Sequence, residues 1–357
     1  MSKLRLEHVV KRYEDYDWEL QIDLQIKHGE ILTLLGPSGC GKTTTLRLIA
    51  GFIRGDSGHV WLDNAILDDV PSYRRNIGVV FQEYALFPHM NVFKNIAFGM
   101  RMKKAYTRQQ IRSRVGELLA LVGLEGYEHR YPDQLSGGEQ QRIALLRAIA
   151  SYPGILLLDE PLSALDFQLR KRLRQEIKNI QRKLGVTMLY VTHDQEEAMS
   201  ISDRIAVMRD GRVEQIGAPV AIYQHPKTHY VAQFVGMSNV ISGTISKIEG
   251  SRFLVKSPQH IFRIPAQPEF VLHDEITFFF RPEDSYLSMQ PEQENVIQGK
   301  IIEHEYLGAE ILTTVKGVDS HTYVISNYIK HETFIEHEGQ EVYLNFPPDV
   351  CKIVRKT

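Results

Sequence analysis

A glycine-rich segment near the start of the chain carries the first residues whose types and spacing could do chemistry. The run Gly36-Pro37-Ser38-Gly39-Cys40-Gly41-Lys42-Thr43 matches the pattern G-x-x-x-x-G-K-[ST]. Its glycines let backbone N–H groups close around phosphate oxygens, and the positive end of a following helix would point at the same charge. The Lys42 amine adds a cation, and the Thr43 hydroxyl suits Mg²⁺. We therefore predict that residues 36–43, with Thr44, bind nucleotide phosphates, and that Cys40 is a tolerated filler rather than a redox switch.

Two adjacent carboxylates form the second chemical group. Asp159 and Glu160 directly follow four apolar residues, Ile155 to Leu158, which indicate a buried strand. In a parallel sheet, the carboxyl end of such a strand borders the ligand crevice. One carboxylate there can hold Mg²⁺ through water, and the other can orient the attacking water. We assign Asp159 to the metal and Glu160 to the water, which predicts ATP hydrolysis.

A second anion-receptive turn lies between these two motifs. Ser136, Gly137 and Gly138 precede a helical pattern of apolar residues that runs from Ile143 to Ile149. One γ-phosphate does not need two such helices from one subunit, so the turn indicates a second copy of the chain. We include Gln140 in this nucleotide-binding set. A plain helix cap is the alternative for this motif taken alone.

Three further side chains complete the predicted site. His193 follows the apolar strand 187–191 and could hydrogen-bond the γ-phosphate and link it to Glu160; a structural histidine is the alternative. Gln82 also ends an apolar strand and can reach Mg²⁺ or the water. Tyr13 is the best available aromatic residue to stack on adenine, with core packing as its alternative.

The elements that must position these residues follow an α/β pattern. Residues 1 to about 235 alternate short apolar runs with helical patterns, as in a domain with a largely parallel sheet. The pattern predicts a strand at Ile31–Leu35 and a helix from Lys42 towards Ala50. Apolar stripes predict further helices at residues 108–122 and 167–184.

The helix predicted at 167–184 is strongly basic. We expect a solvated outer face there, rather than a surface for nucleic acid or lipid headgroups, because the apolar stripe already explains the spacing. Its basic residues are Arg170, Lys171, Arg172, Arg174, Lys178, Arg182 and Lys183.

The pattern changes after Gly236 to short β-rich runs punctuated by Gly, Pro, Asn and Asp, as in a small β-barrel. These runs are Val240 to Val255, Ile276 to Phe280, Val296 to Ile302, Ile311 to Val315, Tyr323 to Ile325 and Val342 to Phe346. We therefore divide the chain into a nucleotide-binding domain at 1–236, with a helical subdomain at about 88–150, and an all-β domain at 237–357.

Composition limits the class of protein. The 357 residues are 43% hydrophobic and 24% charged, with a net charge of −2, which gives no bulk electrostatic reason to expect nucleic acid or an anionic membrane as partner. No apolar run approaches the roughly 18 residues of a membrane span. The start of the chain lacks the apolar core of a secretory signal. The two cysteines, Cys40 and Cys351, fit a reducing cytosol.

Taken together, these motifs resemble the nucleotide-binding subunit of an ATP-binding cassette (ABC) transporter. The corresponding segments are the Walker A loop at 36–43, the Q-loop at Gln82, the signature motif at 135–142, the Walker B strand at 155–160, the D-loop at 163–166 and the switch histidine His193.

The resemblance implies a head-to-tail dimer in which Ser136 to Gly138 cap the ATP held by Lys42 of the other copy. It implies that Mg²⁺ binds with ATP, and that binding closes the dimer and hydrolysis opens it. Two integral membrane permease subunits would be driven through alternating access, with a solute-binding protein as an indirect partner. The chain would then lie on the cytoplasmic face of the inner membrane, bound peripherally through the permease.

The C-terminal segments narrow the subgroup by the same resemblance. Residues 280–284 and 306–308 resemble the oligonucleotide-binding-fold-like (TOBE) regulatory domain of importer ATPases, and residues 81–90 are typical of that group. Residues 98–102 favour polyamines (spermidine/putrescine) as the solute, followed closely by ferric iron and then by sulfate, aminophosphonate or sugar. Glu139 stands where glutamine is commonest in the signature motif.

Two further interpretations are compatible with the sequence. The chain could be a soluble, non-transport ABC ATPase acting on nucleic acid or ribosomes, although its tail shows no basic-aromatic platform, so no nucleic acid is expected. The tail could also sense a small molecule or an inhibitory protein, which is compatible with transport.

Overall fold

The computed structural model describes residues 2–13, 18–163, 165–328 and 337–355. The chain forms two compact units, residues 1–222 and 223–357. The boundary between these units lies before residues 223–236, which the sequence assigns to the nucleotide-binding domain.

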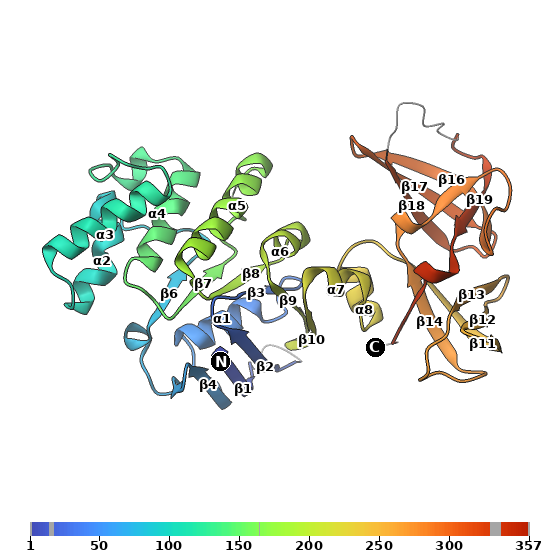
Figure 1. The fold of residues 1–357 in the computed structure, drawn as a ribbon, viewed down its shortest axis with the longest axis horizontal. Coiled ribbons are helices and arrows are strands. Elements are labelled where there is room, and N and C mark those ends of the chain that lie inside the picture. Colours follow the sequence, from blue (N-terminus) through green and yellow to red (C-terminus); the bar gives the residue numbers. More distant parts are fainter. Residues whose placement is uncertain (1, 14–17, 164, 329–336, 356–357) are drawn as a thin grey trace. The chain divides into compact units, whose positions relative to one another are not determined.

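A six-stranded sheet organises the first unit (Figure 1). Its order is β10-β9-β3-β8-β7-β6, and all neighbours are parallel except β10 and β9. The strands are β3 (Ile31–Leu35), β6 (Ile77–Val80), β7 (Ile155–Asp159), β8 (Met188–Thr192), β9 (Arg204–Arg209) and β10 (Arg212–Gly217). Every residue of β3 and β8 is buried, as expected of strands covered on both faces. The register pairs Leu35 with Thr192 and Asp159 with Val191, so these strands end at one edge.

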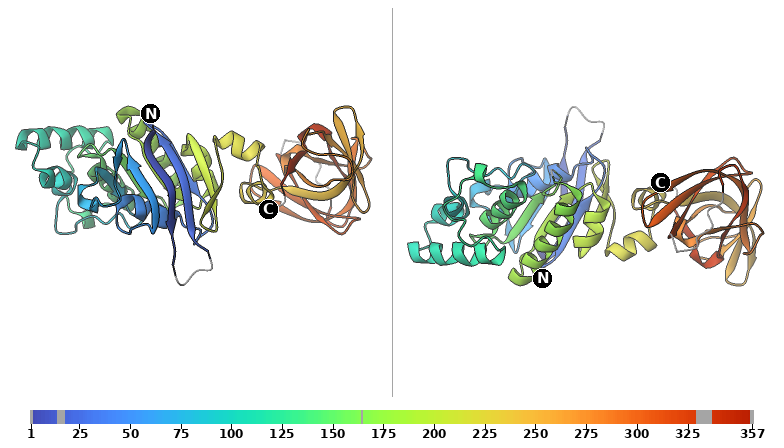
Figure 2. Two further views of the ribbon diagram at one scale, coloured as in Figure 1. Left: turned by 90° about the horizontal axis from the view of Figure 1, so that it is seen from below. Right: turned by 90° about the horizontal axis from the view of Figure 1, so that it is seen from above.

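A second, antiparallel sheet of order β2-β1-β4-β5 packs against the helix that follows β3. Its strands, among the blue strands of Figure 2, are β1 (Ser2–Lys11), β2 (Leu20–Lys27), β4 (Ser57–Leu62) and β5 (Ala65–Ile66). The helix α1 (Lys42–Ala50) begins at Lys42 as predicted and ends at Gly51, which has a φ of 78°. Its Leu46 and Ile49 share one core with Leu4 of β1 and Leu34 of β3.

Three helices form a separate group in the first unit (Figure 1, teal to green). They are α2 (Val92–Lys103), α3 (Arg108–Leu121) and α4 (Gly137–Ile149), and all lie within residues 88–150. Their core includes Ile96, Val115 and Ile143 and continues to Leu158 of β7. This group therefore connects α4 to the central sheet.

The basic helix α5 (Phe167–Leu184) has the predicted bounds, but only part of its basic face is solvated. Arg174 is buried and bonds to Glu196 of α6 (Gln195–Ile201), and Arg170 bonds to Asp194. Lys178 donates to the Ser200 carbonyl. The remaining four, which are exposed, are Lys171, Arg172, Arg182 and Lys183. For three of its seven basic residues the solvated interpretation is therefore wrong, because they tie α5 to α6 and its preceding turn.

The second unit begins with two short α-helices, α7 (Pro219–Gln224), which spans the boundary, and α8 (His229–Phe234). Its later described residues form β-strands and two short 3₁₀ helices. Its two five-stranded antiparallel sheets share one core, orange to red in Figure 2. The first, ordered β13-β12-β11-β14-β20, comprises Ile261–Pro265, Arg252–Lys256, Asn239–Glu249, Glu275–Phe280 and Lys352–Val354. The second, ordered β15-β19-β16-β17-β18, comprises Tyr286–Ser288, Glu341–Phe346, Asn295–Tyr306, Glu310–Gly317 and Thr322–Tyr328. The single run predicted from Val240 to Val255 is a hairpin of two strands.

Arg281 explains why the second unit begins before Gly236. Its guanidinium is buried and donates to the carbonyls of Tyr223, Ala232 and Met237 at 2.7, 3.0 and 2.8 Å. The same group lies 4.1 Å from the centroid of the Tyr223 ring. The chain segment before β11 is thereby fixed to the β-rich unit.

Within the described ranges, no helix has the length and apolar character needed to cross a membrane.

Candidate nucleotide-binding site

The glycine-rich loop joins β3 to α1 and depends on its glycines. A Cβ at Gly36 would lie 2.6 Å from the Met208 carbonyl oxygen, so a side chain cannot fit there. Gly41 has a φ of 102°, and a Cβ on it would lie 2.7 Å from Leu20 Cδ1. Pro37, Ser38 and Gly39 are exposed at the tip of the loop. The tip of the loop is therefore exposed, which the predicted phosphate binding requires.

Lys42 is held inside this loop. It is 4% exposed, and its Nζ donates to the carbonyls of Gly36 and Pro37 at 2.8 and 2.9 Å. Cys40 is also buried, and burial raises the pKa of its thiol. A neutral, enclosed thiol agrees with its interpretation as a filler.

Thr43 and Asp159 come together from α1 and β7. The Thr43 hydroxyl donates to Asp159 Oδ1 at 3.0 Å. Burial raises the pKa of the Asp159 carboxyl, the Thr43 hydrogen bond opposes that rise, and nearby Glu160 adds to it. A hydroxyl and a carboxylate are oxygen ligands that Mg²⁺ accepts, and a divalent cation would favour the ionised carboxylate. Thr44, the next residue of α1, is half-buried.

Glu160 and His193 meet at the same edge of the sheet. Glu160 Oε2 lies 3.1 Å from His193 Nδ1, and the two side chains are 20% and 54% exposed. The Glu160 backbone has a φ of 43° and donates to the Val191 carbonyl at 3.0 Å. Its own carbonyl accepts from Ser163 Oγ at 3.0 Å. The carboxylate is thus presented at the strand end by a backbone in the left-handed region, which costs energy for a residue other than glycine.

The turn at Ser136 begins α4, and its serine is a helix cap. Ser136 Oγ and Ser136 N both donate to Glu139 Oε2 at 2.8 Å, which forms a capping box. The backbone hydrogen bond from Ser136 lowers the pKa of Glu139, so this carboxylate stays ionised at neutral pH. A Cβ at Gly138 would lie 3.1 Å from Leu169 Cδ1, which favours glycine there.

The remaining predicted residues of this turn do not join the glycine-rich loop of the same chain. Gln140 Nε2 donates to the carbonyls of Pro132 and Leu135, within its own turn. Among the described residues, no hydrogen bond connects residues 136–140 to residues 36–44. Both anion-receptive helix ends therefore occur in the chain without sharing a hydrogen bond.

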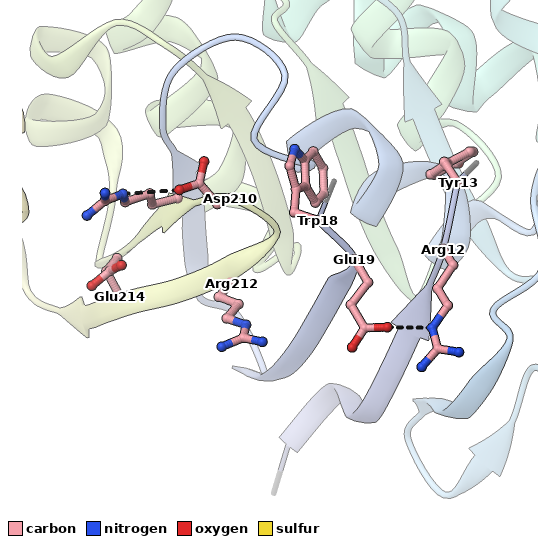
Figure 3. Close-up of a pocket in the computed structure, with 8 residues that line it drawn as sticks. Arg12, Tyr13, Trp18, Glu19, Asp210, Arg212 and Glu214 are labelled. Atoms are coloured by element: carbon pink, nitrogen blue, oxygen red, sulfur yellow. Dashed lines mark hydrogen bonds and ion pairs between the residues drawn. The ribbon is translucent and has the colours of Figure 1, made fainter. Parts of the chain in front are cut away.

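A hollow beside the loop contains the predicted adenine-stacking residue. Tyr13 lines a depression of about 650 Å³ together with Trp18, Glu19, Asp210 and Arg212 (Figure 3). The sequence analysis missed Trp18, although it is one of only two tryptophans. Trp18 lies next to the loop, because its Cη2 is 3.6 Å from a Cβ built on Gly41. Two aromatic rings thus flank the same hollow.

Gln82 is exposed, two residues after the end of β6. Ala164 of the predicted D-loop lies outside the described residues; Ser163, Leu165 and Asp166 are within them.

Comparison with known proteins identifies the family. Residues 20–163 match the model of the ABC transporter family, and residues 279–354 match the TOBE domain. The spermidine/putrescine import ATP-binding protein PotA of Rubrobacter xylanophilus is 41% identical over 98% of this chain and 93% of its own length. PotA of Clostridium novyi is 43% identical over 99% and 98%. The chain belongs to the ATP-binding proteins of the ABC transporter family.

Solved structures agree with this ABC assignment. A dimeric ATP-binding cassette in a post-hydrolysis state with ADP and Pi has a TM-score of 0.53 and 33% identity, covering 60% of this chain and 98% of its own. The cbiO1 protein of Clostridium perfringens, part of the ABC transporter complex cbiONQ, has a TM-score of 0.57 and 30% identity, covering 62% and 90%. The predicted fold class is confirmed, and the chain is an ABC-type ATPase.

Proposed function

We propose that this chain is the ATP-hydrolysing subunit of an importer for polyamines such as spermidine and putrescine. The observation that carries the proposal is the meeting of Thr43 with Asp159 and of Glu160 with His193 at one sheet edge, in a chain whose relatives are named for spermidine/putrescine import. Ferric iron remains the alternative solute, followed by sulfate, aminophosphonate or sugar.

In this proposal the glycine-rich loop binds the phosphates of ATP through its backbone, and Lys42 turns from its own carbonyls to the phosphate oxygens. Glu160 orients and polarises the attacking water. His193 holds the γ-phosphate and keeps the Glu160 carboxylate in place through their 3.1 Å contact. Tyr13, with Trp18 beside it, stacks on adenine.

Mg²⁺ fits the oxygen pair of Thr43 and Asp159, and when bound it would neutralise charge on the β- and γ-phosphates. Gln82, exposed two residues after the end of β6, is the third ligand we assign to it.

The partner for the turn at Ser136 is a second copy of the chain in a head-to-tail dimer. Ser136, Gly137, Gly138 and Gln140 would cap the ATP held by Lys42 of that copy. Two features support this: the N-terminus of α4 is receptive to anions, and it shares no hydrogen bond with the glycine-rich loop among the described residues. A related cassette is dimeric with ADP and Pi.

Two integral membrane permease subunits would dock near Gln82. Phe52 and Phe81 support this site, because both rings are exposed, at 49% and 38%, and they stack with centroids 6.0 Å apart. An exposed aromatic pair suits the apolar face of a docked helix. The chain would thereby lie peripherally on the cytoplasmic face of the inner membrane, with a solute-binding protein as an indirect partner. The TOBE unit would act as a regulatory domain.

Co-purification of the tagged full chain from detergent-solubilised native membranes tests the transport role, with partners identified by mass spectrometry. A multi-span permease and a solute-binding protein are expected. Titration of that binding protein with spermidine, putrescine and Fe³⁺ then tests the solute. Binding of iron but not of polyamine would overturn the polyamine assignment, and recovery of ribosomes without a permease would overturn transport.

A further inference from the structure

One arginine connects two loops that the nucleotide site depends on. Arg170 lies in the first turn of α5, and its guanidinium forks between two acceptors. Its Nη1 donates to Asp194 Oδ2 at 3.0 Å, and its Nη2 donates to the Leu165 carbonyl at 3.0 Å. Asp194 directly follows His193, whereas Leu165 belongs to the D-loop. The planar, rigid fork of an arginine can hold two such acceptors in a fixed relation.

Asp194, which Arg170 holds, in turn fixes the backbone around His193 through its hydrogen bonds. Its Oδ1 accepts from the Glu197 N–H at 2.9 Å and caps α6, while its Oδ2 accepts from Arg170. Its own N–H donates to Thr192 Oγ1 at 3.0 Å. The residues on both sides of His193 are therefore fixed by hydrogen bonds.

The buried carboxylate of Glu197 holds the residues that precede His193. Glu197 is 3% exposed, and its Oε2 accepts from Thr192 Oγ1 at 2.8 Å and from Tyr190 OH at 3.0 Å. Its Oε1 lies 3.9 Å from Arg170 Nε. Arg170 thus faces two carboxylates of the turn and helix that carry the histidine.

The D-loop, which Arg170 holds through the Leu165 carbonyl, contacts both Glu160 and the signature turn. Ser163 Oγ donates to the Glu160 carbonyl at 3.0 Å. A Cβ on Gly137 would lie 3.7 Å from Leu165 Cδ2, so the D-loop also packs next to the signature turn. A shift of that turn would therefore reach the Leu165 carbonyl and the arginine bonded to it.

We propose that Arg170 is a positioning residue that couples the orientation of His193 to the D-loop and, through it, to the signature turn. The inference rests on the proposed function and specifies its regulation. In a head-to-tail dimer, one chain would contribute its signature turn to one ATP and its His193 to the other, so Arg170 would link the two ATP sites.

A purely structural role would also tie α5 to α6, and the chain contains a matched control for that role. Arg174, one turn further along α5, donates to Glu196 of α6 at 2.9 Å, and no hydrogen bond of the described residues joins Arg174 to the D-loop. Glu196→Gln weakens this second α5–α6 contact without touching the coupling link. The side chain of Glu196 is 60% exposed, so the change is mild.

Three variants of the full chain test the link: Arg170→Lys, Asp194→Asn and the double variant. Lysine keeps the charge but cannot bridge both acceptors. Asparagine keeps the Oδ1 that caps α6 and places an amide donor opposite the guanidinium. Steady-state ATP hydrolysis gives kcat and KM, nucleotide binding gives the dissociation constant of ATP, and thermal unfolding compares each variant with Glu196→Gln.

We expect kcat to fall at least about tenfold in each single variant, with KM and the ATP dissociation constant within about threefold of wild type. The double variant should be no slower than the slower single variant, because both substitutions break the same link between Arg170 and Asp194. Glu196→Gln should retain kcat within about twofold.

Three results would overturn the coupling role: near wild-type kcat in Arg170→Lys, a multiplicative loss in the double variant, or an equal loss in Glu196→Gln. Failure of the wild-type chain to hydrolyse ATP would instead refute the proposed function, and this inference with it.

Discussion

Replacement of Glu160 by glutamine should separate ATP binding from hydrolysis. The backbone of residue 160 is held by its bond to the Val191 carbonyl and by the Ser163 hydroxyl, and neither depends on the side chain. Glutamine has nearly the same shape and can keep an oxygen 3.1 Å from His193 Nδ1. The fold should therefore be unchanged, and the change at the site is the loss of one negative charge and of one base.

The magnitude follows from the surroundings of the carboxylate. A positioned general base contributes about 10²–10⁴ in rate, which corresponds to about 2.7–5.4 kcal/mol of the barrier. The carboxylate of the preceding residue, Asp159, already accepts the Thr43 hydroxyl at 3.0 Å. We therefore expect a loss of kcat in the upper part of this range. ATP affinity should stay the same or increase, because the loss of a negative charge near the phosphates reduces repulsion.

Phosphate release from the purified full chain measures the loss, and nucleotide binding with size-exclusion chromatography measures ATP affinity and ATP-dependent dimer formation. Glu196→Gln is the matched carboxylate-to-amide control, since Glu196 lies on α6 and bonds to Arg174. Glu160→Gln should accumulate as an ATP-bound dimer. Turnover within tenfold of wild type, or loss of ATP binding, would show that Glu160 does not act as the base.

Further predictions concern other parts of the site and the second unit. Lys42→Ala should weaken ATP binding by about 10- to 150-fold, the value of a charged hydrogen bond worth about 1.5–3 kcal/mol, as isothermal titration would show. Gly36→Ala should lower the free energy of unfolding in urea by about 1–3 kcal/mol, because its Cβ would lie 2.6 Å from the Met208 carbonyl oxygen. Asp159→Asn should raise the thermal midpoint of the Mg²⁺-free chain at neutral pH while removing Mg²⁺-dependent hydrolysis. In the unaltered chain the pKa of Asp159 is raised, so the protonated carboxyl stabilises the fold at low pH. This stability is lost as pH rises through that pKa. Burial raises the pKa of Cys351 to about 12, so iodoacetamide should modify the folded chain slowly at pH 8, and stability should fall as pH rises from 9.0 towards 12.

The sequence predicts best those elements that are buried on both faces. The apolar run before the glycine-rich loop gives β3 with its bounds, and the run before Asp159 gives β7 to within one residue. Such strands have no solvent face, so continuous apolar residues identify them without knowledge of their neighbours. Helices α1 and α5 are similarly clear, because their stripes and terminal glycines, Gly51 and Gly185, are local signals.

The elements that the sequence does not predict have a weaker signal or depend on distant partners. In β2, Leu20–Lys27, buried and exposed residues alternate strictly, so a strand signal is present there although no strand is predicted. The strand β1 carries register shifts against both of its neighbours, which interrupt such an alternation. The domain boundary depends on Arg281, which bonds to a carbonyl 58 positions earlier, a contact that no local pattern reveals. The role of Arg170 is equally hidden from local sequence patterns, because its partner Asp194 is 24 positions away on another element.

Several of the predicted site residues adopt states that cost free energy in the chain without a ligand. Burial raises the pKa of Asp159, so its ionised form is costly in the free chain, and the next residue, Glu160, has a φ of 43°. Lys42 is almost fully buried, and its hydrogen bonds within the described part of the chain go to carbonyls of its own loop. A sheet edge selected only for stability would not bury one carboxylate beside a second one. The cost becomes intelligible if bound nucleotide and Mg²⁺ offset it, because a ligand that stabilises these charges in the folded state also stabilises the fold. The raised pKa of Asp159 and the strained backbone of Glu160 therefore support the nucleotide site independently of the resemblance of its motifs.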